Sequence, residues 1–411
     1  MSKNKRRMSY LVAAVLICLA LVLTSCSSGV TTPTPTATNT VQAKYINVGV
    51  LATLSGFGAT WGLPALNGFR LFEHDFNAAG GIKIGDQTYL INVIAYDNQG
   101  SNDLTVSLAN KLITQDKVSY IYAGAYLEIL VAPISTQYKV ILNSWPVQGY
   151  LSPDSPYLFY NHVNYFLMFK MNYDWLQTQF PDKKRVAMVT LDSLDGRACG
   201  GYMQNITQAL NMTLIDPVYY PASTTDFYPV LTPLLRQNPD IIETSGGYGE
   251  QSALIVKAAR ELGYKGLIMV PGLLIEDLVS IAGKDNLDNV YNYGSSPEPT
   301  SPDISPAEKA FYDRYVQFFG DPKFATNAIN FYTDAQIYTQ AVAIAQSLDT
   351  DKVVSALHNN EFTTLFGSAR YFGMSKWGVD NQFPAPLYMT KVVDGQYVPT
   401  VKLVPTPDMI Q

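Results

Sequence analysis

The sequence predicts an α/β fold of two doubly wound lobes, preceded by a secretory signal and a tether. Its 411 residues exceed the usual length of one domain. Hydrophobic residues make up 47% of the chain and charged residues 15%, which is enough to form sizeable cores. From Lys44 onward, short β-rich runs alternate with stretches of helical spacing, and the alternation stops and restarts once. This pattern indicates two largely parallel sheets, each covered by helices on both faces.

The first 26 residues have the pattern of a lipoprotein signal. A basic cluster, Lys3–Arg7, precedes the apolar run Leu11–Leu23, which is too short for a comfortable membrane-spanning helix. The run ends in Leu23-Thr24-Ser25-Cys26, which closely resembles the lipobox of bacterial lipoproteins. We expect a signal peptide over residues 1–25 and a lipid on Cys26, which anchors the chain at the outer face of the cell membrane or on the periplasmic side. An ordinary signal peptide or a short N-terminal anchor is the alternative.

A soft tether is expected to follow over residues 26–44. The segment Ser27–Ala43 is rich in threonine, contains Pro33 and Pro35, and has almost nothing to bury. Extended, it would reach on the order of 50 Å. Once Cys18 has left with the signal and Cys26 carries lipid, Cys199 has no partner, so we expect no disulfide and a buried, inert thiol.

The first half of the folded part reads as a run of strands separated by helices. Its expected strands are Ile46–Leu51, Tyr89–Tyr96, Ser119–Tyr122 and Val140–Leu142. Its expected helices are Pro64–Ala79, Asn102–Gln115 and one near Leu127–Tyr138. Leu104, Leu108 and Leu112 recur four residues apart and so share one helical face.

After an aromatic, proline-containing passage at Trp145–Tyr165, the alternation restarts. The expected strands of the second half are Arg185–Thr190, Thr213–Tyr219, Asp240–Glu243 and Leu267–Val270. Its expected helices are Arg197–Leu210, Asp226–Gln237 and Glu250–Leu262. Two further helices, Pro306–Phe319 and Asn327–Gln346, precede irregular β-structure over residues 364–402.

Composition and motifs argue against several classes of function. The formal net charge is −6, and without the four cations before Ser25 it is −10, so nucleic acid and anionic lipid are unsuitable partners. The three histidines are scattered outside any metal-binding spacing. No Gly-x-Ser-x-Gly turn exists, and Trp61 stands at the third glycine position of the dinucleotide-like loop that begins at Gly56. We therefore expect no enzyme, no metal and no cofactor.

What remains is a set of strand-to-helix loops, where open α/β sheets bind ligands. They are Thr53–Gly62, Gly124–Glu128, Asn143–Trp145, Asp192–Gly196, Ser245–Glu250 and Gly272–Glu276. Their mixture of aromatic and single polar side chains suits a cleft for an organic solute. For each aromatic residue, packing in the core is the alternative.

A series of short motifs resembles the leucine/isoleucine/valine-binding protein family over roughly residues 45–400. In chain order they are Val48-Gly-Val-Leu-Ala-Thr-Leu-Ser-Gly56, Trp61-Gly62, Asn77-Ala-Ala-Gly-Gly-Ile82, Tyr96-Asp-Asn98, Ser223-Thr-Thr-Asp-Phe227, Asn238-Pro-Asp240, Ala258-Ala-Arg-Glu-Leu-Gly263, Tyr332-Thr-Asp-Ala335, Phe366-Gly367 and Tyr371-Phe372. No single motif is specific, but their combination in this order is.

The resemblance implies a type I periplasmic-binding fold, in which two α/β lobes are joined by three crossovers and close on a ligand like a hinge. We expect lobe 1 to comprise residues 45–161 and 293–372, and lobe 2 to comprise residues 162–292 and 373–411. The implied protein is a monomer that captures a small-molecule solute for an ABC permease in the membrane. It would touch the membrane only through its lipid.

The family's ligand residues carry over only in part. Tyr248 fits a ligand tyrosine, and Trp61 occupies the aromatic position before Gly62. Asp195 replaces another tyrosine, and the acid expected after Gly272 is Leu274, with Glu276 two residues further on. The residues that we expect to contact the solute are Trp61, Tyr126, Glu128, Asn143, Ser144, Trp145, Tyr165, Asp195, Tyr248 and Glu276.

These departures predict a ligand that differs from leucine. The serine-bearing loop of the family reads Gly124-Ala-Tyr-Leu-Glu128 here and lacks its hydroxyl. Asp195 would receive an amine or a hydroxyl, whereas Asn143 and Ser144 would satisfy a carboxylate or an amide. We expect an amino-acid-like or carboxylate-type solute with an aromatic or bulky apolar part and one polar end. The alternatives are a sensor subunit for a chemoreceptor or kinase, a surface hydrolase and a structural adhesin.

Overall fold

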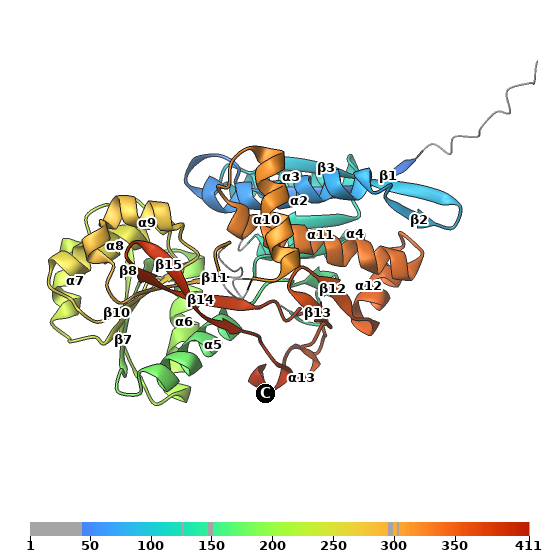
Figure 1. The fold of residues 1–411 in the computed structure, drawn as a ribbon. Helices are drawn as coiled ribbons and strands as arrows, with labels where there is room; N and C mark the ends of the chain where they lie inside the picture. Colours follow the sequence, from blue (N-terminus) through green and yellow to red (C-terminus); the bar gives the residue numbers. More distant parts are fainter. Residues whose placement is uncertain (1–42, 125–126, 147–150, 295–298, 302–303, 411) are drawn as a thin grey trace, which may run out of the picture. The chain divides into compact units, whose positions relative to one another are not determined.

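The computed structural model describes residues 43–124, 127–146, 151–294, 299–301 and 304–410. The predicted signal peptide, Cys26 and most of the tether lie outside the described residues. The described chain forms two sheets of mostly parallel strands with helices on both faces, so the predicted fold class is confirmed (Figure 1). No helix within the described ranges is both long and apolar enough to cross a membrane.

The first sheet has the strand order β2-β3-β1-β4-β5-β6 and is parallel apart from the β2–β3 pair. Its strands are β1 (Lys44–Ala52), β2 (Ile82–Ile84), β3 (Gln87–Asp97), β4 (Tyr120–Ala123), β5 (Ile141–Ser144) and β6 (Leu158–Phe159). A short 3-10 helix, η1 (Gly56–Gly58), follows β1. The central strand β1 pairs with β3 on one side and with β4 on the other, and from Ile46 onward most of its residues are buried.

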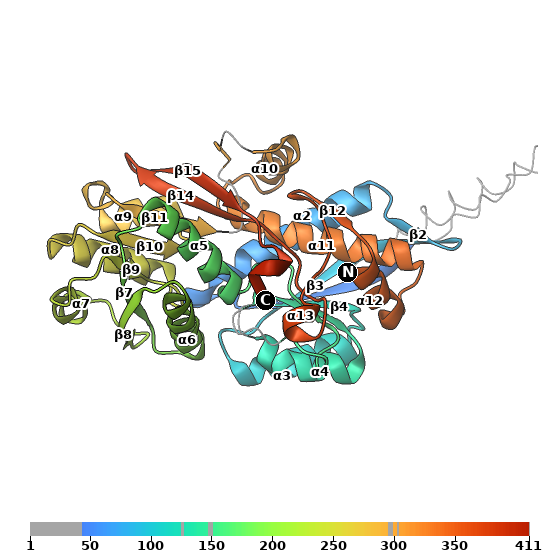
Figure 2. The ribbon, with the colours of Figure 1, turned by 90° about the horizontal axis from the view of Figure 1, so that it is seen from below.

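Of the described helices, two cover one face of this sheet and four cover the other (Figure 2). On one face lie α3 (Asn102–Thr114) and α4 (Glu128–Tyr138). On the other lie α2 (Ala59–Ala78), α10 (Pro306–Phe319), α11 (Ala325–Ala345) and α12 (Thr350–Asn359). Helices α2 and α11 approach so closely that a Cβ at Gly68 would lie 2.4 Å from the Ala328 carbonyl oxygen. A segment from the C-terminal half of the chain therefore completes the core of the first sheet.

The second sheet has the order β15-β14-β11-β10-β9-β7-β8, with β14 and β15 antiparallel to their neighbours. Its strands are β7 (Arg185–Leu191), β8 (Thr213–Tyr220), β9 (Ile241–Glu243), β10 (Leu267–Pro271), β11 (Val290–Gly294), β14 (Leu387–Val393) and β15 (Gln396–Leu403). Helices α5 (Tyr165–Gln179) and α6 (Leu194–Ala209) pack with one core. Helices α7 (Tyr228–Leu235), α8 (Gly249–Glu261) and α9 (Ile275–Ala282) pack with the other.

The remaining elements are short. They are η2 (Lys284–Asn286), the pair β12 (Phe362–Thr364) and β13 (Gly367–Ala369), α13 (Met374–Trp377) and η3 (Pro407–Ile410). The irregular β-structure predicted for residues 364–402 is thus a small hairpin followed by two long strands of the second sheet.

Three connections carry the chain between the sheets: β6 to α5, β11 to α10, and the segment from Phe372 to β14. The first and third lie side by side, because Tyr160 pairs with Gln382 in an isolated bridge. The Gln382 side chain donates to the carbonyls of Tyr160 and His162 and accepts from Asn164. The two connections are therefore tied by a buried side-chain amide.

The observed α2 starts earlier than predicted. A proline favours the first turn of a helix, which is why the sequence suggests a start at Pro64. The structure adds a turn before it, beginning at Ala59. Gly62 in this turn lies against the chain after β1, since a Cβ there would lie 1.9 Å from the Thr53 carbonyl oxygen. The additional turn carries Trp61.

Candidate functional site

A cavity of about 460 Å³ lies where loops of the two sheets meet. From the first sheet and its helices it is lined by Ala52, Thr53, Gly58, Trp61, Gly62, Gly100, Asn102, Tyr122, Gly124, Leu127, Ile129, Leu130, Trp145, Asn327 and Phe331. From the second it is lined by Tyr165, Met168, Leu191, Ser193, Leu194, Asp195, Gly246, Gly247, Tyr248, Pro271, Gly272, Tyr293, Gly294 and Leu387. All six loops singled out in the sequence contribute, and the volume falls within the usual range for small-molecule sites.

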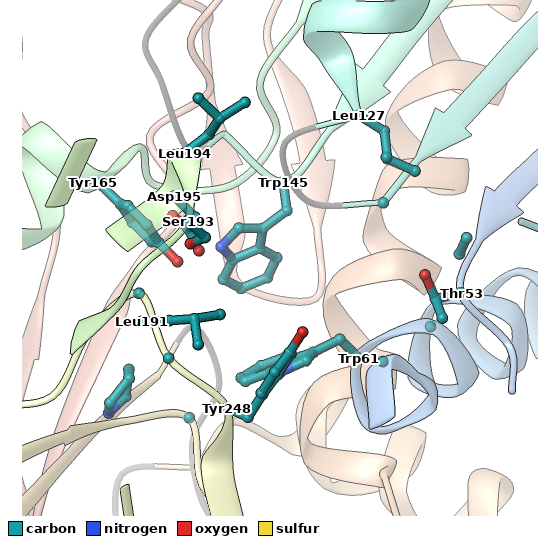
Figure 3. Close-up of a pocket in the computed structure, with 18 of the residues that line it drawn as sticks. Thr53, Trp61, Leu127, Trp145, Tyr165, Leu191, Ser193, Leu194, Asp195 and Tyr248 are labelled. Carbon is teal, nitrogen blue, oxygen red and sulfur yellow. The ribbon is translucent and has the colours of Figure 1, made fainter. Parts of the chain in front are cut away.

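Five of the predicted site residues line this cavity: Trp61, Trp145, Tyr165, Asp195 and Tyr248. Figure 3 places Tyr165 and Asp195 on one side, and the rings of Trp145, Trp61 and Tyr248 across the middle. Four of the five are aromatic, so the cavity presents ring faces with one carboxyl group among them.

The other predicted residues lie elsewhere. Glu128, Asn143 and Ser144 are fully buried behind the cavity, where the Ser144 hydroxyl donates to the Glu128 carboxylate at 3.1 Å. Glu276 is exposed on α9. Tyr126 lies outside the described residues. The expected pairing of Asn143 and Ser144 with a solute carboxylate therefore has no support in the cavity lining.

Trp61 reaches from α2 to the opposite sheet. The tip of its indole comes so close to Gly272, after β10, that a Cβ on this glycine would lie 2.9 Å from the ring. Gly272 also has a φ of +52°, a left-handed conformation that glycine adopts without steric penalty. Both the close approach of the ring and the backbone conformation therefore favour glycine at position 272. Trp61 forms a direct contact between the two sides of the cavity.

Trp145 is held from behind by a buried polar pair. Its ring stacks on His162, with centroids 4.6 Å apart and planes at 25°. The His162 ring nitrogen lies 3.0 Å from the Asp334 carboxylate on α11, and both side chains are almost completely buried. Because His162 belongs to the first connection between the sheets, the orientation of Trp145 is coupled to that connection.

Asp195 stands in the first turn of α6. Ser193 caps this helix by accepting the Gly196 N–H at 3.1 Å. Loss of hydration at the cavity wall raises the pKa of the half-buried Asp195 to about 7, and the Cys199 thiol, 3.8 Å away, opposes part of the rise. Burial raises the pKa of Cys199 itself, so the thiol stays protonated and inert, in agreement with its expected structural role.

A second carboxyl group, Glu243 at the end of β9, is buried behind the cavity. Its oxygens accept from the hydroxyls of Tyr293 at 2.6 Å, Ser245 at 2.7 Å and Tyr173 at 3.2 Å. Burial raises its pKa, and these hydrogen bonds oppose the rise. Since Tyr293 lines the cavity, the network fixes one of its walls.

Sequence reasoning missed several lining residues, of which Tyr122, Tyr293 and Phe331 are the largest. Tyr293 lies just before the last residue of β11, a strand that was not predicted, although Tyr291 and Tyr293 alternate in the manner of a strand before Gly294. Phe331 comes from α11, which is distant in sequence and carries no local sign of a binding site. Among the described residues, no cluster of three or more His, Cys, Asp or Glu side chains could bind a metal ion.

Two α/β lobes with a solute-sized cavity between them define a class: solute-binding proteins of the periplasmic type. A family model described as periplasmic binding protein matches residues 45–396. The chain belongs to this family, as the resemblance predicted.

Similarity to individual proteins is distant but covers most of the chain. The Leu/Ile/Val-binding protein homolog 8 of Brucella melitensis is 24% identical over 358 residues, covering 84% of this chain and 87% of the relative. The branched-chain amino acid transporter substrate binding protein LivJ of Streptococcus pneumoniae, solved with isoleucine, has a TM-score of 0.73 at 22% identity, covering 88% of this chain and 99% of that one.

A solute binding protein of an ABC transporter from Rhodopseudomonas palustris HaA2, solved with p-hydroxybenzoic acid, has a TM-score of 0.74 at 20% identity. The match covers 89% of this chain and 98% of that one. At such identities the structural neighbours establish the fold, and they do not establish the ligand.

Proposed function

We propose that the chain is the solute-binding component of an ABC importer and that it captures a small amino-acid-like or aromatic solute between its lobes. The observation that carries the proposal is the cavity between the sheets, with aromatic side chains on both sides. Relatives named as Leu/Ile/Val-binding proteins and neighbours solved with isoleucine or p-hydroxybenzoic acid support this class of ligand. The mixture of ring faces and a few polar groups is typical of such sites.

Capture is proposed to occur by hinge closure. The three connections between the sheets would act as the hinge, with lobe 1 formed by residues 45–161 and 293–372 and lobe 2 by residues 162–292 and 373–411. Contacts that exist only when the lobes meet, such as Trp61 against Gly272, favour the closed form. A solute that touches both lobes shifts the population toward closure, and the permease would recognise the closed shape.

We further propose that the protein is a monomer anchored outside the cytoplasmic membrane by a lipid on Cys26. The apolar run followed by Thr24-Ser25-Cys26 supports this anchor, and the threonine-rich tether would let the folded part meet the permease. Replacement of Cys26 by serine should release the chain from the membrane fraction into the soluble fraction. If Cys26→Ser remains in the membrane fraction, a lipid on this residue is not the anchor.

The proposed function is tested by identifying the solute and by watching the protein close. Native mass spectrometry of the gently purified chain should reveal a co-purifying small molecule, and its removal followed by re-addition should lower the radius of gyration in small-angle scattering. The variant Trp61→Ala is the comparison, because it removes the ring that reaches the opposite lobe and should weaken closure. A scattering profile unaffected by any co-purifying or screened solute would refute the transport role.

A further inference from the structure

The cavity lacks positive charge. None of its described lining residues is Lys, Arg or His. The undescribed residues of the neighbouring loops, 125–126, 147–150 and 295–298, contain no Lys, Arg or His either. The nearest guanidinium along the chain, that of Arg197, pairs with Asp192 at 2.6 Å and lies over the Tyr219 ring, 4.6 Å from its centroid. No basic side chain is therefore available to neutralise an anionic solute.

Carboxyl groups, by contrast, lie at and behind one wall of the cavity. Asp195 lies on the wall, and Glu128 and Glu243 are fully buried behind it. All three carboxyl groups influence Tyr165, which also lines the cavity. Burial is the main cause that raises the pKa of this tyrosine, and the charges of Asp195, Glu128 and Glu243 add to the rise. The electrostatic field in this part of the cavity favours cations and disfavours carboxylates.

Several hydroxyl donors at and behind the wall of the cavity are already engaged. Thr53 donates to the Asn98 side chain at 2.7 Å, and the buried Ser144 has its hydroxyl 3.1 Å from Glu128. The Tyr293 hydroxyl donates to Glu243 at 2.6 Å. An anionic group placed beside Asp195 would face this carboxyl group, which is unfavourable in a partly desolvated site.

We propose that the solute is an organic cation: a protonated amine on an aromatic or bulky apolar group, without a carboxylate. Its ammonium group hydrogen-bonds to Asp195 and lies against the ring faces of Tyr165 and Trp145, and its apolar part lies toward Trp61 and Tyr248 (Figure 3). A cation is attracted both by a carboxylate and by the negative face of an aromatic ring. This inference rests on the proposed function and narrows the chemical class of its solute.

Four probes that share a phenylethyl group test the inference by calorimetry on the purified chain, freed of any co-purifying solute. They are 2-phenylethylamine, the neutral 2-phenylethanol, the anion 3-phenylpropanoate and the zwitterion phenylalanine. The amine should bind at least tenfold more tightly than the alcohol, and the anion should not bind measurably. Tighter binding of 3-phenylpropanoate or phenylalanine, or no binding of the amine at millimolar concentration, would overturn the inference.

The second test of the inference measures how substitutions and pH change the affinity for the amine. Asp195→Asn should weaken the amine at least tenfold and leave the alcohol nearly unchanged, whereas Asp216→Asn, which removes an exposed acid of β8 outside the cavity lining, should change neither. Binding of the amine should strengthen between pH 6 and pH 8 as Asp195 ionises. The titratable groups around Asp195 are Cys199, Tyr165, Glu243 and Glu128, and the first two remain neutral in this range because burial raises their pKa.

The two proposals fail in different ways. If the co-purifying solute is a carboxylate that closes the protein, the cation inference is wrong and the transport role stands. If the amine binding is the same in Asp195→Asn as in the unaltered chain, the assignment of Asp195 is wrong. Only the absence of closure with every solute would remove the proposed function itself.

Discussion

Because Trp61 contacts Gly272 across the cavity, we expect an added side chain at Gly272 to hinder closure of the two lobes. In Gly272→Ala, the new Cβ would lie 2.9 Å and 3.3 Å from two atoms of the Trp61 ring. Real side-chain carbons do not approach so closely, so either the indole moves or the lobes stay further apart. The perturbation is therefore expected to act on the closed form and to weaken solute binding.

The magnitude has two parts that can be separated. Overpacking of this kind costs about 1–3 kcal/mol, which corresponds to a loss of affinity of about 5-fold to 150-fold if it acts only on closure. Independently, a non-glycine residue at a φ of +52° costs about 1–2 kcal/mol, in the open and the closed form alike. The second part lowers the melting temperature and leaves the affinity unchanged.

Gly263→Ala is the matched control. Gly263 ends α8 with a φ of +89°, and a Cβ there would meet nothing within 4 Å. It should therefore show only the loss of stability. Calorimetric titration of the co-purifying solute into Gly272→Ala and Gly263→Ala separates the closure effect from the backbone effect.

A double-mutant cycle identifies the clash as the cause. Trp61→Ala removes the ring, so adding Gly272→Ala to it should cost little further affinity. The reasoning would be refuted if Gly272→Ala binds as tightly as Gly263→Ala, or if its effect is as large without the Trp61 ring as with it.

Three further predictions concern stability, each measured by urea unfolding. Glu243→Ala should lower the free energy of unfolding by about 2–3 kcal/mol, because three buried hydroxyls lose their acceptor; a loss below about 0.5 kcal/mol would contradict this. The pKa of Asp195, 3.8 in its ordinary state and about 7 in the fold, means that the folded chain binds more protons between about pH 4 and pH 7. The unaltered chain should therefore lose stability as pH rises through this window, and Asp195→Asn should lose less, whereas an equal slope in both would refute the assignment. Ser305→Ala should cost about 1 kcal/mol, since Ser305 caps α10 in a capping box with Glu308, and an unchanged midpoint would contradict it.

The alternation of strands and helices was predictable because each element has a local period. Strand β1 and the face of α3 that carries Leu112 are examples, since their apolar residues recur at two- and four-residue spacing. The binding loops could be predicted from these strands, because the carboxyl ends of parallel strands lie at one edge of a sheet. Helix α5 was missed, since apolar and aromatic residues occur on nearly all its faces and give no clear period.

The direction of individual side chains was less predictable. Asn143 and Ser144 were expected at the cavity, but β5 continues through Ser144, which pairs with Ala123, and both polar side chains are buried. Glu276 was expected to replace the family acid, yet it lies on the exposed face of α9 while Leu273 is buried. Such outcomes depend on where a strand ends and how a helix is rotated, and both are set by tertiary packing. Trp61 and Asp195 lie at the cavity because each stands in the first turn of a helix that starts there.

We propose that the solute lies between the two sheets, among the rings of Trp61, Trp145 and Tyr248 and beside Asp195. The most direct measurement is a crystal structure of the purified chain with its co-purifying solute. We expect electron density for the solute in this cavity, in contact with residues of both sheets. Density bound elsewhere, or a cavity filled by the protein's own side chains in the presence of the solute, would contradict the account.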